Sequence, residues 1–190
     1  MRKLLLAILS PLLVWTAVAA EVGKPSPPLN IQGVNSAPLQ LSQYKGKVIA
    51  LALIDTNCPH CQNLTKLLST IAKDYQGKPV QIVACAFNDH AQDLIAEFKQ
   101  RFQPSFPVGY CSREEVMTYV QYTAVKPFYV PHMVFLDKRG IVRGDYAGES
   151  DFMTKPDVNV RTELDKLLTP ATVSASAHKA APASTATRKE

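Results

Sequence analysis

Charge, glycine and long hydrophobic runs are all scarce in this sequence of 190 residues. Charged residues make up 19%, and there are 8 glycines and one tryptophan. This balance, with a mean hydropathy of -0.05, excludes a disordered acidic protein, a collagen and a protein that crosses the membrane many times. The hydrophobic share of 46% is enough for one ordinary folded domain.

The formal net charge of +5 belongs to the two ends of the chain. Two positive charges lie in the first twenty residues, and a net two lie in the last twenty. Residues 21–170 therefore carry only +1. A body with so little net charge has no basic face to offer, and we expect no nucleic-acid partner.

The first twenty residues have the three parts of a secretory signal peptide. Two positive charges come first, an apolar run follows over Leu4–Val14, and small residues stand at Ala17–Ala20. We predict a signal peptide over residues 1–20, cleaved after Ala19 or Ala20, and a periplasmic or secreted protein. The alternative is an uncleaved membrane anchor, for which the apolar stretch is short.

The last twenty residues differ from the rest in composition. Ala171–Glu190 contains alanine, serine, threonine, proline and lysine, with no large apolar residue beyond Val173. Such a segment cannot bury enough surface to offset the entropy of ordering it. We predict a disordered low-complexity tail over 171–190.

Between these ends, strand and helix patterns alternate. Continuous apolar runs of buried-strand length lie at Lys47–Ile54 and Val80–Phe87, and helical stripes follow at Gln62–Tyr75 and around Leu94–Phe102. The remaining predicted elements are a short strand at Phe106–Gly109, a helix near Glu114–Tyr122, two hairpin strands at His132–Leu136 and Ile141–Tyr146, and a last helix at about Asn159–Leu168. This order predicts an α/β fold in which helices flank both faces of a central mixed β-sheet.

The chain has four cysteines, and two of them form the motif Cys58-Pro59-His60-Cys61. This motif follows the first buried strand and opens the first helix. Proline is favoured at the first helical position, which makes Cys58 the N-cap residue. The free N–H groups and the positive end of the helix dipole favour a thiolate there, and a protonated His60 would add to the effect. Cys61 follows on the same helical face, one turn later.

This spacing predicts a redox-active pair, in which Cys58 is the nucleophile and Cys61 is the resolving thiol. A zinc site is an alternative, but it requires a second cysteine pair at similar spacing, and Cys85 and Cys111 are 26 residues apart. A purely structural disulfide between Cys58 and Cys61 is a second alternative, although so short a loop restrains the unfolded chain little.

The motif in this setting resembles the thioredoxin superfamily. Leu39–Lys47 is similar to the segment that precedes the active-site strand in the TlpA/ResA-like exported thioredoxins, and Tyr129–Asp137, followed by Arg139-Gly140, is similar to their closing segment. The resemblance covers residues 24–169. It implies that residues 21–170 form a thioredoxin-like domain with an N-terminal β extension.

The resemblance also implies activity and further site residues. It implies disulfide exchange with protein thiols or disulfides, a redox partner that resets the motif, and neither a cofactor nor a metal. We expect a monomer. Val130–Pro131 would be a cis peptide bond beside the cysteines, where the backbone of residue 130 pairs with substrate; the alternative is a trans proline at the start of a strand.

The sequence departs from the family in ways that bear on its chemistry. Asn57 stands where an aromatic residue is usual, and Ala52 stands where thioredoxins carry a buried carboxylate. Asp55 is the nearest candidate proton acceptor; otherwise it is a solvated residue at a strand end. The scaffold resembles reductases, whereas the Pro59-His60 pair and Val130 resemble oxidising DsbA-type proteins. Both directions of transfer therefore stay open.

The second pair of cysteines has two interpretations. If the fold is that of thioredoxin, Cys85 and Cys111 follow or end neighbouring strands, and an exported protein can join them in a structural disulfide. They could equally be two separate buried thiols, since free cysteine behaves as a small apolar residue.

Two other functions remain as alternatives. One is a copper chaperone similar to the Sco type, with Cu(I) on Cys58 and Cys61 and a nitrogen from His60 or His132; those proteins have a CxxxC motif instead. The other is a peroxidase similar to peroxiredoxins. Their motif places threonine three residues before the reactive cysteine, and Thr56 is only two residues before Cys58.

Overall fold

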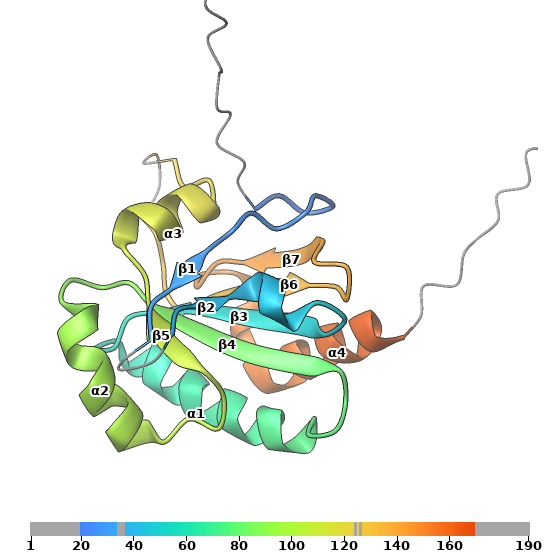
Figure 1. Ribbon diagram of the computed structural model, residues 1–190, viewed down its shortest axis with the longest axis horizontal. Coiled ribbons are helices and arrows are strands. Elements are labelled where there is room, and N and C mark those ends of the chain that lie inside the picture. Colours follow the sequence, from blue (N-terminus) through green and yellow to red (C-terminus); the bar gives the residue numbers. More distant parts are fainter. Residues whose placement is uncertain (1–19, 34–36, 124, 126, 170–190) are drawn as a thin grey trace, which may run out of the picture.

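The computed structural model describes residues 20–33, 37–123, 125 and 127–169. The predicted signal peptide, apart from Ala20, and the predicted tail lie outside these residues. A central sheet has the strand order β5-β4-β3-β6-β7, and a two-stranded sheet pairs β1 with β2 (Figure 1). The strands are β1 (Asn30–Ile31), β2 (Leu39–Gln40), β3 (Val48–Ile54), β4 (Val80–Ala86), β5 (Val108–Tyr110), β6 (His132–Leu136) and β7 (Val142–Tyr146).

Helices cover both faces of the central sheet. They are α1 (Pro59–Asp74), α2 (Ala91–Phe102), α3 (Arg113–Tyr119) and α4 (Pro156–Leu168), with short 3₁₀ helices η1 (Leu41–Tyr44) and η2 (Asp151–Thr154). Apolar side chains of α1, α2 and α4 pack on one face, and those of α3 and the N-terminal segment pack on the other (Figure 1). The predicted α/β thioredoxin fold, with helices on both faces and an N-terminal β extension, is confirmed.

The sheet is mixed because of how its central strand pairs. β3 is parallel to β4 and antiparallel to β6, and all seven of its residues are buried. A strand covered on both faces requires a continuous apolar run, which is what VIALALI provides. Leu53 pairs with His132, so the end of β3 and the start of β6 lie side by side at one end of the sheet. Cys58 and Pro131 flank these two strand ends in the sequence.

The N-terminal extension is held to the edge strand β5 by backbone pairing. Gln32 and Tyr110 exchange two backbone hydrogen bonds of 2.7 and 2.9 Å. The extension approaches β5 so closely that a Cβ atom on Gly109 would lie 2.3 Å from the carbonyl oxygen of Gln32. Only glycine permits this contact.

Three predicted element boundaries were wrong. The short strand is β5, two residues later than expected, because Pro107 has no N–H for the ladder although Phe106 is buried. α3 ends at Tyr119 rather than Tyr122, and Gln121 has a left-handed φ of 52°. α4 begins three residues early because Pro156 is tolerated at the first helical position. Within the described ranges, no helix combines the length and the apolar character that crossing a bilayer requires.

Candidate active site

The two cysteines of the motif lie at the start of α1. Cys58 is the N-cap residue, with extended backbone angles, and Pro59 occupies the first turn. The first helical hydrogen bond runs from the N–H of Gln62 to the carbonyl oxygen of Cys58, at 3.0 Å. The Cys58 side chain therefore lies at the end of the helix where the first-turn N–H groups and the dipole favour negative charge.

The two thiols differ in their access to solvent. Cys58 is half-buried, whereas Cys61 is fully buried. Burial raises the pKa of the Cys61 thiol well above its ordinary value, and the nearby Cys58 raises this pKa further. A hydrogen bond from the Asp55 N–H to the Cys61 sulfur, at 3.4 Å, lowers the pKa but does not offset the effect of burial. The two thiols are near enough to influence one another. A reagent from solution therefore meets Cys58 first.

Asp55 belongs to the turn that connects β3 to α1. Its carbonyl oxygen accepts from the Cys58 N–H at 3.2 Å, and its carboxylate accepts from the Asn57 N–H at 2.7 Å. The carboxylate is near enough for its charge to raise the pKa of Cys61 slightly. Asp55 thus shapes the loop that carries Cys58 and also places a carboxylate near the buried thiol.

The peptide bond between Val130 and Pro131 is cis. Pro131 is buried directly before β6, and Val130 packs against the cores on both faces of the sheet. Because β6 begins beside the end of β3, the Val130–Pro131 bend lies at the same end of the sheet as the cysteine loop.

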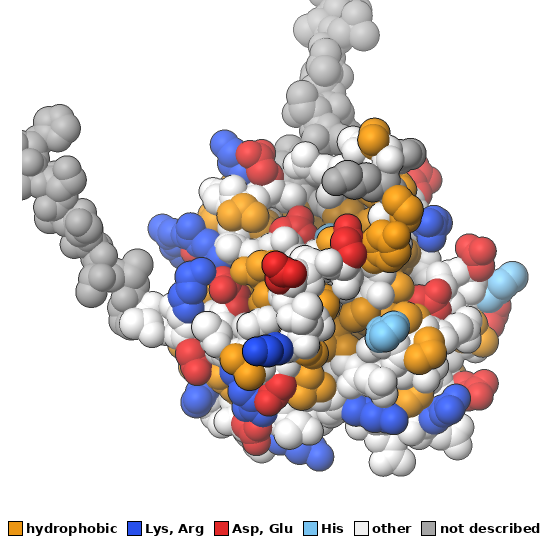
Figure 2. All heavy atoms as spheres, turned by 180° about the vertical axis from the view of Figure 1, so that it is seen from behind, with side chains coloured by type: hydrophobic (Ala, Val, Ile, Leu, Met, Phe, Trp, Pro, Cys, Tyr) orange, Lys and Arg blue, Asp and Glu red, His pale blue; other side chains and the backbone are white. Residues whose placement is uncertain are grey.

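A groove of about 510 Å³ is lined by His60 of the motif and by the Val130–Pro131 bend. Figure 2 shows hydrophobic side chains gathered around an exposed histidine on the rear face of the molecule. The groove is lined mainly by apolar side chains from α1, from the segment before β6 and from η2. These side chains are Leu64, Leu67, Tyr129, Val130, Pro131 and Met153, and the exposed His60 lies among them. It can hold an apolar segment of a partner beside His60, the residue between the two cysteines.

Gly148 fixes one wall of this groove. Its N–H donates to the Tyr129 carbonyl oxygen at 3.3 Å, and a Cβ atom there would lie 2.9 Å from that oxygen. Sequence reasoning missed Gly148, Tyr129 and Met153 as site residues. No local pattern marks these three residues, because they lie in separate segments that meet only in the folded protein.

His132 follows Pro131 but faces away from the groove. It pairs with Leu53, whose side chain packs in the α3-side core. Its Nε2 forms a hydrogen bond with the Asp145 carboxylate, and its ring stacks on Phe128 with the centroids 5.1 Å apart. Its position therefore fits packing rather than a role as a ligand beside the cysteines.

Thr56 is also directed elsewhere. It is buried, its hydroxyl accepts from the Asn88 side chain at 3.0 Å, and its N–H donates to the same side chain at 2.9 Å. The Asn88 side-chain amide thus holds the cysteine loop against the segment that follows β4. The threonine hydroxyl is occupied by Asn88 instead of Cys58.

The second cysteine pair lies on the other face of the sheet. Cys85 and Cys111 are joined in a disulfide with their Cα atoms 6.0 Å apart. Both pack in the α3-side core, whereas Cys58 and Cys61 pack on the α1 side. Among the described residues, no group of three or more histidine, cysteine or carboxylate side chains is placed to hold a metal ion.

Comparisons with known proteins agree with this geometry. The sequence model of the AhpC/TSA family matches residues 22–144. The chain is 25% identical to the thiol-disulfide oxidoreductase ResA of Geobacillus thermodenitrificans, over 87% of this chain and 95% of that one. It is 26% identical to ResA of Bacillus thuringiensis subsp. konkukian, over 68% and 71% of the two chains.

Solved structures show the same fold. A thiol:disulfide interchange protein from Chlorobium tepidum TLS superposes with a TM-score of 0.62 at 18% identity, over 80% of this chain and all of that one. A thiol:disulfide interchange protein from Bacteroides sp. superposes with a TM-score of 0.63 at 15% identity, over 85% and 99% of the two chains.

Proposed function

Because this chain belongs to the AhpC/TSA family, with ResA proteins among its relatives, we propose that it is a thiol–disulfide oxidoreductase acting on proteins. One observation carries the proposal: an accessible Cys58 at a helix start has a buried Cys61 one turn behind it. The signal-like leader further supports an exported protein.

The reaction proceeds through a mixed disulfide. The Cys58 thiolate attacks one sulfur of a substrate disulfide, forms a bond to it and releases the other substrate sulfur as a thiolate. Cys61 then loses its proton and attacks the Cys58 sulfur, which releases the second substrate thiolate. The substrate gains two electrons and the cysteine pair becomes a disulfide; an oxidase runs the same steps in reverse.

The surroundings of the thiols support these steps. Burial raises the pKa of Cys61 and so favours its protonated form while Cys58 reacts. The Asp55 carboxylate and the departing substrate thiolate are then available to accept its proton. An extended substrate segment would lie along Val130, with an apolar side chain in the groove beside Leu64 and Met153.

Trapping the intermediate tests the mechanism. A labelled peptide with one internal disulfide is incubated with the Cys61→Ala variant and analysed on a non-reducing gel. We expect an adduct that dithiothreitol removes, and no adduct with the matched Cys58→Ala variant. Equal labelling of the two variants, or none at all, would refute the roles assigned to the two thiols.

The reduction potential of the Cys58–Cys61 couple identifies the direction. A value near about −270 mV, as in thioredoxin, indicates a reductase, and a value near about −120 mV, as in DsbA, indicates an oxidase. Equilibration with glutathione buffers in the Cys85→Ala/Cys111→Ala background isolates this couple from the second disulfide.

A further inference from the structure

A second cavity lies at the end of the sheet opposite to the thiols. Its lining comes from the chain before β3, the N-terminal segment and the turn between β6 and β7. β3 runs from this cavity toward Cys58, so a ligand here would leave the cysteine groove open. The volume is about 370 Å³, within the range of about 300–1,000 Å³ typical of small-molecule sites.

The floor of this cavity is apolar. It consists of four buried aliphatic side chains from the N-terminal segment, η1, β3 and β6: Leu29, Leu41, Ile49 and Leu136. Pro25, Pro27 and Pro28 form part of the wall. Prolines have no N–H, so this wall offers few backbone donors to a peptide strand, and it suits a hydrocarbon chain better.

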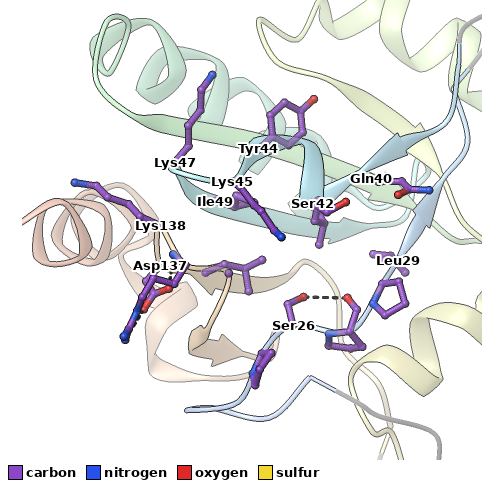
Figure 3. A pocket seen from close by; sticks show the side chains of 17 residues that line it. Ser26, Leu29, Gln40, Ser42, Tyr44, Lys45, Lys47, Ile49, Asp137 and Lys138 are labelled. Carbon is purple, nitrogen blue, oxygen red and sulfur yellow. Dashed lines mark hydrogen bonds and ion pairs between the residues drawn. The ribbon is translucent and has the colours of Figure 1, made fainter.

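The rim of the cavity is cationic. Lys45, Lys47, Lys138 and Arg139 are exposed and line it. Figure 3 shows that Lys45 points into the cavity, whereas Lys47 and Lys138 point away from it. The Lys138 ammonium donates to the Leu168 carbonyl oxygen at 3.3 Å. Among the described residues, no carboxylate lies within ion-pair distance of these three lysines.

The carboxylate at the rim is already neutralised. Asp137 accepts from the Arg143 guanidinium at 2.7 Å and from the backbone N–H of Ile141 at 3.0 Å. Of the described residues that line the cavity, it is the only acidic one. The rim therefore carries unbalanced positive charge above an apolar floor.

From this arrangement we propose that the cavity binds an acyl chain that carries an anionic head group. The acyl chain would cover the aliphatic floor, and the head group would lie beside Lys45. A free fatty-acid anion and an anionic membrane lipid share this chemistry. The site is independent of the thiol chemistry proposed above.

Calorimetric titration with sodium decanoate, matched by decanol as the neutral probe, tests the proposal. We expect saturable binding of one decanoate and weaker binding of decanol. Lys45→Gln should weaken decanoate binding about twofold to fivefold, as for exposed ion pairs, and leave decanol unchanged. Lys138→Gln should have a smaller effect, because the Lys138 ammonium points away from the cavity and donates to Leu168. The matched control is Lys66→Gln/Lys73→Gln, which removes two exposed charges from α1.

A steric variant separates the cavity from general surface attraction. Ser42 lines the cavity, and its exposed neighbour Gln43 in η1 does not. Ser42→Trp should abolish decanoate binding, and Gln43→Trp should not. Both variants should exchange the peptide disulfide at the wild-type rate, which shows that they are folded.

Vesicles of phosphatidylglycerol distinguish the two sources of the acyl chain, a free fatty acid and a membrane lipid. Co-sedimentation that Ser42→Trp abolishes identifies a membrane lipid, whereas decanoate binding without co-sedimentation identifies a free fatty acid; either result supports the proposal. Absence of saturable decanoate binding, equal affinity for decanol, or unchanged binding by Ser42→Trp overturns it. Binding of an acidic peptide without decanoate overturns it as well.

Discussion

The Cys85–Cys111 disulfide allows a quantitative prediction about stability. The bond closes a loop with a sequence separation of 26 residues. In the chain-entropy treatment, a loop of this length restricts the unfolded state enough to stabilise the fold by about 3.5 kcal/mol. Because both cysteines are buried in the α3-side core, away from Cys58, breaking the bond should lower stability and leave disulfide exchange intact.

A background without the motif cysteines measures this contribution cleanly. In the Cys58→Ala/Cys61→Ala protein, urea unfolding is followed with and without dithiothreitol, so the bond breaks and no side chain is removed. We expect a loss of about 3.5 kcal/mol, equivalent to about 7–14 °C in melting temperature for a domain of this size.

Two comparisons make this prediction refutable. A loss below about 1 kcal/mol would show that the bond does not restrain the unfolded chain as the loop length requires. The Cys85→Ala/Cys111→Ala variant, which keeps the motif, should reduce the peptide disulfide at the wild-type rate. A large fall in that rate, measured below the melting temperature of the variant, would show that the two faces of the sheet are coupled.

Three further predictions concern accessibility, the groove and pH. Iodoacetamide should alkylate Cys58 in the native protein and spare Cys61 until urea is added; equal labelling, read by mass spectrometry, would contradict the observed burial. Gly148→Ala should cost about 1–3 kcal/mol of stability and slow the exchange of the peptide disulfide, because the added Cβ would meet the Tyr129 backbone at 2.9 Å. Wild-type exchange kinetics in this variant would show that the groove wall at Gly148 takes no part in substrate binding. Burial raises the pKa of Asp137, but the N–H and guanidinium donors around it lower the pKa overall, so its folded-state pKa is below the unfolded one. Its stabilising contribution is therefore complete above about pH 4 and is lost at lower pH, and the stability difference between wild type and Asp137→Asn should shrink as the pH falls, as a series of urea titrations would reveal.

Local patterns were sufficient to predict most of the fold. The β3 run is apolar at every position because both of its faces are covered, and a continuous run of that length has few other uses. The turn after β6 was equally predictable from the sequence Asp137-Lys138-Arg139-Gly140. The structure shows the reason for its residue types: Gly140 has a φ of 79°, and the Asp137 carboxylate accepts from the N–H of Arg139 at 2.9 Å.

One helix start could have been predicted better. Ser112 and Glu115 form a capping box, in which the Glu115 N–H donates to the serine hydroxyl and the glutamate accepts from the Ser112 N–H. The S-x-x-E spacing is visible in the sequence and places the first helical residue at Arg113. The helix end was not visible, because a left-handed Gln121 carries no compositional signal.

The groove and the second cavity could not be predicted from local patterns. Tyr129 and Gly148 are brought together by the β6–β7 hairpin, and Leu29 meets Leu136 only because the N-terminal segment crosses the sheet. Periodicity identifies which residues are buried, but it does not identify which buried residues end beside an opening. The orientation of His132 was decided by sheet register, which depends on partners far away in the chain.

The burial of Cys61 has a kinetic consequence. Cys61 is already held next to the mixed disulfide, so its attack on the Cys58 sulfur is intramolecular and first order. Small thiols in the surroundings can cleave the same bond only by collision, at a rate proportional to their concentration. At low thiol concentration the built-in sulfur therefore limits how long each captured partner stays attached.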